Sequence, residues 1–135
     1  MADDIQFQIN LENPIAVYVQ IENQIQFAIS AGTLKPGDAL PSVREMASQL
    51  GVNSNTVTKA YRDLELKGYV VTRRGIGVRV APKADQLCRR ETKRMVQDHL
   101  HDAVAECIAA GLSSQEVTRI VSHVVRNNHR PYGKK

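Results

Sequence analysis

The chain contains 135 residues, of which 42% are hydrophobic and 24% are charged, and its net charge is +4. This length suits one compact domain with a small appendage and excludes a second large domain. No apolar run approaches the roughly 18 residues of a membrane span, and the acidic start MADDIQ is unlike a secretion signal, so a cytoplasmic location is expected.

The charge is unevenly distributed along the chain. Residues 1–34 carry four acidic residues and no Lys or Arg, whereas residues 35–81 carry eight basic residues against four acidic ones. A basic central segment is what a surface that binds a polyanion requires, although many domains carry such a charge without binding one.

The first thirty residues predict an arm and then a helix. Apolar residues alternate with polar ones at Ile5, Phe7, Ile9 and Leu11, which predicts a short strand or an extended arm. Asn13-Pro14 predicts a helix start, with Asn as the cap and Pro in the first turn, and the helix runs to Gly32. Its apolar residues share one face, and its Gln and Asn residues are expected to face solvent.

Residues 41–68 predict two short helices joined by a tight turn. Ser42 is a helix cap, and Glu45 three residues later completes a capping box. Gly51 ends the first helix at a position that favours the left-handed conformation, and Asn53 caps the second helix, which Gly68 closes. The spacing predicts a helix-turn-helix, a motif that places its second helix in the major groove of DNA.

The residues on either side of this motif predict a winged domain. Before it, Lys35-Pro36-Gly37-Asp38 fits a type II turn, and Leu40 is placed to form a short strand. After it, residues 69–73 and 78–81 predict the two strands of a hairpin with residues 74–77 at its tip. A helix, a helix-turn-helix and a hairpin in this order make a winged helix-turn-helix.

Two amphipathic helices are predicted after the wing, over residues 83–110 and from 114 to about 126. These two helices have no core of their own, so their apolar stripes should be buried against a second copy of the chain, which predicts a homodimer. The residues expected at that interface are Val96, Leu100, Val104, Ile108, Val117, Ile120, Val121 and Val124. The fold class is therefore mainly α with a small β wing. Residues 1–81 form the winged domain, 82–128 a helical dimerisation hairpin, and 129–135 a tail expected to be disordered.

Residues that contact DNA are expected on three elements. Lys35 and Arg44 are placed to meet phosphates, and polar side chains at the start of the second helix of the motif are placed to read base edges. At the wing tip, basic side chains are expected against the backbone or in the minor groove. The complete set is Lys35, Arg44, Ser54, Asn55, Thr56, Thr58, Lys59, Arg62, Arg73, Arg74 and Gly75.

Other reactive residues predict no catalytic or metal site. Cys88 and Cys107 lie far apart without metal-ligand spacing and are expected to be reduced. The four histidines, His99, His101, His123 and His129, are expected to be solvated or at an interface. No nucleophile–base arrangement or phosphate loop occurs, so neither an enzyme nor a cofactor is expected.

Residues 14–80 resemble the N-terminal domain of GntR-type bacterial transcription regulators. The matching pieces are PIAVYVQIENQI, GTLKPGDALPSVREMASQLGVNSNTVTKAY, LELKGYV and TRRGIGVRV. The resemblance implies that Arg44 touches DNA, as do the polar start of the recognition helix and the wing tip at Arg74 and Gly75. Ser54 and Thr58 stand where other members carry arginine, so base preference does not transfer.

The short C-terminal region resembles that of the YtrA-like subgroup, whose two C-terminal helices mediate dimerisation. Only 54 residues follow Ala81, too few for the larger effector-binding domains of other members. The leading hypothesis is a homodimeric repressor that binds a pseudo-palindromic double-stranded operator. One alternative is a regulator that senses a small effector between the C-terminal helices and the winged domain. Another is a winged-helix interaction or architectural module.

Overall fold

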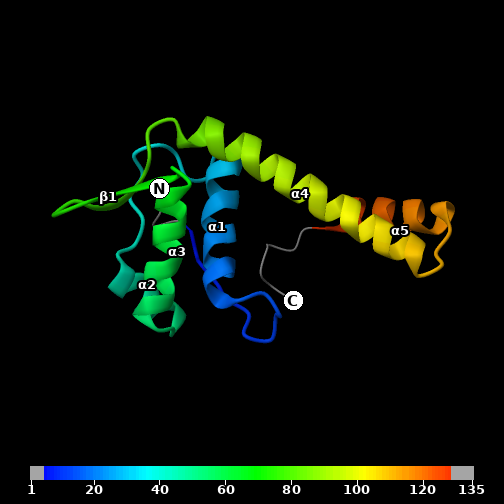
Figure 1. Cartoon of the computed structure of the whole chain (residues 1–135), viewed down its shortest axis with the longest axis horizontal. Coiled ribbons are helices and arrows are strands. Elements are labelled where there is room, and N and C mark those ends of the chain that lie inside the picture. The colour runs from blue at the N-terminus through cyan, green and yellow to red at the C-terminus, as the bar shows by residue number, and fades with distance from the viewer. Residues whose placement is uncertain (1–4, 129–135) are drawn as a thin grey trace.

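The computed structural model describes residues 5–128, and the predicted tail at 129–135 lies outside them. Three helices and a projecting β-hairpin lie together at one end of the molecule. A long helix leads from them to a small helical hairpin at the other end (Figure 1). The mainly α fold with a small β wing is confirmed. In chain order the elements are α1 (Val17–Ala31), α2 (Val43–Leu50), α3 (Ser54–Leu66), β1 (Val70–Arg73), β2 (Gly77–Val80), α4 (Ala84–Ala109) and α5 (Ser114–Asn127).

The helix-turn-helix forms as its capping residues predict. The hydroxyl of Ser42 accepts a hydrogen bond from the Glu45 amide, and the Glu45 carboxylate accepts one from the Ser42 amide, both at 3.1 Å. Gly51 ends α2 with a φ of 67°, and Asn53 caps α3 by accepting from the amide of Asn55 at 2.7 Å. Because both ends of the turn are fixed locally, α3 begins at one defined place.

The wing is a two-stranded antiparallel sheet held to the body by the segment before α2. Val70 pairs with Val80 and Arg73 with Gly77, within one residue of the predicted strand ends. The amide of Gly37 donates to the carbonyl of Val80, and that of Leu40 to the carbonyl of Val78, both at 2.9 Å. The expected short strand at Leu40 is a single bridge one residue earlier.

The first helix starts later than predicted. Asn13 does not cap it, since its side chain accepts instead from the amide of Ile15 at 2.9 Å, closing a local turn. The carbonyl of Ile15 is in turn taken by the side-chain amide of Gln20 at 2.8 Å. The helix therefore starts at Val17 instead of Pro14.

The expectation that the amides of α1 face solvent is wrong for two of them. Gln20 and Gln26 are each 3% exposed. Gln20 accepts from the amide of Asn10 and donates to its carbonyl, and Gln24 does the same with Gln8. One turn of helix matches two residues of extended chain in length. The two glutamines that face the arm, Gln20 and Gln24, thus bind it as a neighbouring strand would.

The first half of α4 packs on α1, whereas its second half runs away from the winged domain (Figure 1). Ala84, Cys88 and Thr92 are buried on the packed side. The side-chain amide of Gln26 donates to Thr92 Oγ1 at 3.4 Å, and the Cys88 thiol donates to the backbone carbonyl of Gln26 at 3.3 Å. At the far end, a capping box formed by Ser113 and Glu116 starts α5.

Candidate nucleic-acid interface

The outward face of α3 is polar from Ser54 to Glu65. Val57, Ala60, Tyr61 and Leu64 are buried on the opposite side, and the Tyr61 hydroxyl donates to the Pro41 carbonyl at 2.7 Å, which ties α3 to the start of α2. Of the α3 residues predicted to contact DNA, Ser54, Asn55, Lys59 and Arg62 are exposed, and Thr56 and Thr58 are half-buried.

The start of α2 presents a second polar element. Arg44 lies exposed in its first turn, and Lys35 is exposed in the loop before it. The hydrogen bond from the Ser42 amide lowers the pKa of Glu45, so its carboxylate stays ionised within the capping box. Arg44 and Glu45 thus lie in the same helix turn, and the carboxylate of Glu45 is hydrogen-bonded to Ser42.

The wing projects freely from the body, and its tip carries the predicted basic residues. Arg73, Arg74 and Gly75 are all exposed. The amide of Ile76 donates to the carbonyl of Arg73 at 3.0 Å, which closes the turn. Gly75 and Gly77 have φ values of 81° and 96°, so the turn requires glycine on both sides of Ile76.

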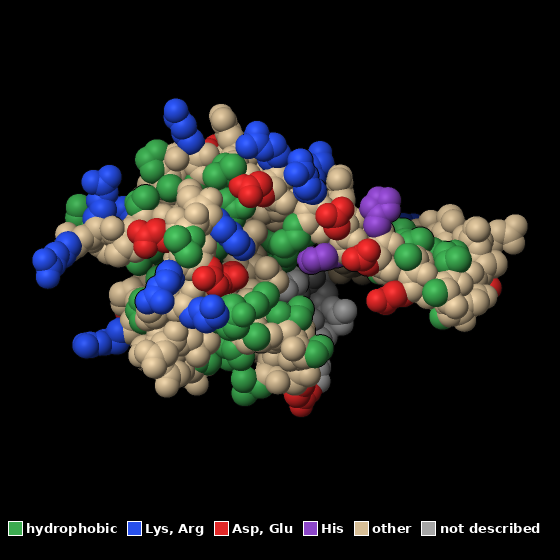
Figure 2. Space-filling view, viewed as in Figure 1, with side chains coloured by type: hydrophobic (Ala, Val, Ile, Leu, Met, Phe, Trp, Pro, Cys, Tyr) green, Lys and Arg blue, Asp and Glu red, His purple; other side chains and the backbone are tan. Residues whose placement is uncertain are grey.

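Basic side chains gather over the wing and around the helix-turn-helix on one face of the molecule, and again over the start of α4 (Figure 2). Apolar side chains are instead visible over α4 and α5 at the far end. In this view most basic side chains thus lie over the winged end and the start of α4, and few lie at the far end. This distribution favours two distinct contacts, one with a polyanion at the basic end and one with an apolar partner at the far end.

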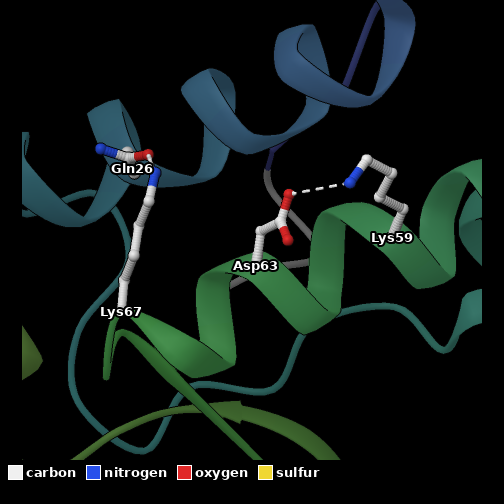
Figure 3. Close-up of polar contacts among 4 residues, drawn as sticks. All are labelled: Gln26, Lys59, Asp63 and Lys67. Carbon is white, nitrogen blue, oxygen red and sulfur yellow. Dashed lines mark hydrogen bonds and ion pairs between the residues drawn. The ribbon is translucent and has the colours of Figure 1, made fainter.

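Lys59 is directed toward its own chain rather than standing free. Its Nζ lies 3.8 Å from Asp63 Oδ2 and 4.7 Å from the centroid of the Tyr18 ring on α1. Further along α3, the Nζ of Lys67 donates to Gln26 Oε1 at 3.0 Å (Figure 3). The contacts of Lys59 with Tyr18 and of Lys67 with Gln26 tie α3 to α1, and sequence reasoning missed them because the partners are distant in the chain.

A buried carboxyl group lies in the same α1–α3 contact. Glu22 is 6% exposed, and among the described residues no hydrogen-bond partner reaches its Oε1. Burial, together with the hydrogen bond to Asp63 and its charge, raises the pKa of Glu22 to about 7. The same hydrogen bond lowers the pKa of Asp63. Glu22 therefore keeps its proton at mildly acidic pH and loses it as the pH rises through about 7, while Asp63 stays ionised and paired with Lys59.

The predicted dimerisation residues lie on α4 and α5, and most of them are solvent-exposed in the single chain. Leu100 is 57% exposed, and Val124 is 49% exposed, whereas Val117 is 7% exposed because it packs inside the hairpin. A hollow of about 300 Å³ with a wholly apolar lining lies on this surface. Of the other predicted residues, Val96, Ile108 and Ile120 are exposed, and Val104 and Val121 are half-buried.

The cysteines and histidines form no cluster within residues 5–128. Cys88 is buried and Cys107 is half-buried, and both are free thiols. Burial raises the pKa of Cys88, which makes its thiol less reactive. In the same described range no group of three potential metal ligands is found, and no helix there is long and apolar enough to cross a membrane.

Comparison with known proteins agrees with this arrangement. The model of bacterial regulatory proteins of the gntR family matches residues 17–80. An uncharacterised HTH-type transcriptional regulator of Bacillus subtilis, YhcF, is 40% identical over 101 residues, which cover 75% of this chain and 83% of YhcF. The chain belongs to the GntR family. The HTH-type transcriptional repressor YtrA of the same organism is 32% identical over 117 residues, covering 87% of this chain and 90% of YtrA, so this GntR protein is YtrA-like.

Solved structures extend the likeness to the fold. A GntR family transcriptional regulator from Listeria monocytogenes matches with a TM-score of 0.70 and 29% identity, covering 84% of this chain and 99% of its own. The AraR DBD, solved in complex with operator ORX1, matches with a TM-score of 0.50 and 27% identity over 57% of this chain and 99% of its own. The relatives of this GntR protein are DNA-binding regulators and not enzymes, as the sequence predicts.

Proposed function

We propose that this GntR protein is a homodimeric repressor that binds a pseudo-palindromic operator through α2, α3 and the wing. The observation that carries the proposal is the exposed polar face of α3, which begins at an Asn53 cap and points Ser54 and Asn55 away from the core. Repression is inferred from the name of the YtrA relative, and operator binding agrees with the AraR complex.

Within this proposal the contacts divide by chemistry. Ser54 and Asn55 lie at the start of α3, where a recognition helix meets base edges, and Asn has the paired donor and acceptor that adenine offers in the major groove. Arg44 and Arg62 are placed for phosphates, which set register without reading sequence. Thr56 and Thr58 have less room to reach bases because they are half-buried.

A second copy of this chain is the proposed occupant of the apolar surface on α4 and α5. Exposed apolar residues on both helices, including Leu100 of α4 and Ile120 and Val124 of α5, surround one apolar hollow, and Val96 of α4 is exposed one helical turn before Leu100. An isologous contact between two such surfaces would bury all of them and present two recognition helices to DNA. Operator half-sites about 34–36 Å apart, one helical turn, would fit such a pair.

The DNA proposal is tested with fragments selected from genomic DNA and with scrambled versions of them. Arg44→Ala should weaken binding to both and reduce the salt slope by about 1, whereas Asn55→Ala should lose about 1–3 kcal/mol on the selected fragment alone. Arg119→Ala, a change of the same charge on exposed α5, is the matched control. Equal losses on both DNAs would reject Asn55 as a reader. If every fragment bound no better than its scrambled version, the regulator proposal would fail.

The dimer proposal is tested by sedimentation of Val124→Glu beside Ser122→Glu. Both residues are exposed on α5, but only Val124 lines the apolar hollow. Burying a carboxylate without a partner is strongly unfavourable, so Val124→Glu should sediment as a monomer and Ser122→Glu as a dimer. If the Val124→Glu protein remained a dimer, the interface would have to lie elsewhere on the chain.

A further inference from the structure

The apolar tip of the wing is not explained by the contacts assigned so far. Ile76 is 56% exposed, although the neighbouring inward side chains of the wing, Val78 and Val80, are buried against the body. The hydrogen bond from the Ile76 amide to the Arg73 carbonyl fixes the turn. The wing projects from the molecule (Figure 1), and the defined turn at its tip presents the exposed side chain of Ile76.

We propose that Ile76 enters the minor groove of the operator and makes the wing select A·T over G·C pairs at the position it contacts. The inference rests on the proposed DNA-binding function and assigns the wing tip a role in reading sequence as well as holding the backbone. The occupant is DNA because Arg73 and Arg74 precede Ile76 in the same tip turn and are exposed. A polyanion would satisfy these charges, and the minor groove offers an apolar side chain the sugar walls and base edges.

The selectivity follows from what the minor groove displays. A·T and T·A pairs show only acceptors there, whereas a G·C pair adds the 2-amino group of guanine. Ile76 has no side-chain acceptor, so over a G·C pair it would cover that donor and leave it without a hydrogen bond. Arg73 and Arg74 act in the same direction, since narrow A·T-rich minor grooves attract arginine.

The test compares G·C with inosine·C, two base pairs that differ from each other only in the minor groove. In a selected fragment, each A·T pair flanking the α3 contacts is replaced in turn by G·C and by inosine·C, a pair that lacks the 2-amino group. At the wing position, wild-type protein should bind the G·C fragment about 10-fold more weakly, and inosine·C should restore the affinity. Ile76→Ala should lose most of the difference between the two fragments and keep only the part that Arg73 and Arg74 contribute. Ile76→Asn, whose amide oxygen can accept from guanine, should favour G·C over inosine·C.

Leu66→Ala is the control, because Leu66 is an equally apolar, 80% exposed residue at the opposite end of α3 from Ser54. It should leave the ratio between the G·C and inosine·C fragments unchanged. If inosine·C binds as weakly as G·C at every position, or if Ile76→Ala keeps the full ratio, the inference is overturned while the regulator proposal stands. If no fragment is preferred over scrambled DNA, the regulator proposal itself fails, and the inference with it.

Discussion

Replacing Glu22 by glutamine should remove a pH-dependent loss of folding stability that arises at the contact between α1 and the recognition helix. Glu22 is 6% exposed, and its pKa rises from an ordinary value of 4.5 to about 7. The folded protein thus binds this proton more tightly than the unfolded chain does. The resulting stability is fully present below pH 4.5 and is lost as the pH rises through 7.

The magnitude follows from these two pKa values. Full deprotonation removes about 3 kcal/mol, and the part lost between pH 6 and pH 8 is about 1.3 kcal/mol. Ionised Glu22 then faces Asp63, whose carboxylate is already paired with Lys59. The neutral side-chain amide of a glutamine at this position can donate to Asp63 at every pH, so Glu22→Gln should be about 1–2 kcal/mol more stable than wild type at pH 8.

The assay is urea unfolding of both proteins from pH 6 to pH 8 at one protein concentration. The difference between the two curves isolates Glu22, because every other titrating group, including the histidines, is present in both proteins. Glu106→Gln, the same change at an exposed site on α4, should follow the wild-type curve. Parallel curves for wild type and Glu22→Gln, or a variant less stable at pH 8, would refute the reasoning.

Three further predictions concern local contacts. Ser42→Ala should lower the free energy of unfolding by about 1 kcal/mol in urea because it removes the α2 capping box, and no change would reject that role. Gln24→Ala should speed hydrogen exchange at the amide of Gln8, which it holds, and unchanged protection would mean that other contacts secure the arm. Thr92→Val should cost about 1–2 kcal/mol in thermal unfolding, since the buried amide of Gln26 loses its acceptor, and a neutral result would show that the bond contributes nothing.

Local signals in the sequence predicted the helix-turn-helix well. Ser42, Gly51 and Asn53 act within a few residues of their own positions, so their chemistry can be read without the fold. The same holds for the hairpin. The predicted contacts of individual residues with DNA, and the dimer, stay predictions, because a single chain contains neither partner.

The buried amides of α1 were missed for a different reason. Hydrophobic periodicity assigns Gln20 and Gln26 to the solvent side, yet each is buried by a segment distant in sequence, the arm in one case and α4 in the other. The late start of α1 has the same origin, since Gln20 takes the Ile15 carbonyl. The signal available in the sequence was the spacing of Gln20 and Gln24, four residues apart on a helix that follows an alternating arm.

Gln26 links the part of the chain proposed to bind DNA to the part proposed to form the dimer. Its side-chain oxygen accepts from Lys67 at the end of α3, and its side-chain amide donates to Thr92 of α4. One buried residue of α1 therefore touches both the recognition helix and the helix that leads to the dimer surface. In a dimer paired through α4 and α5, the distance between the two recognition helices depends on the angle at which α4 leaves the winged domain. Because the buried side of α4 extends only as far as Thr92, the contacts of Gln26 lie where that angle is set.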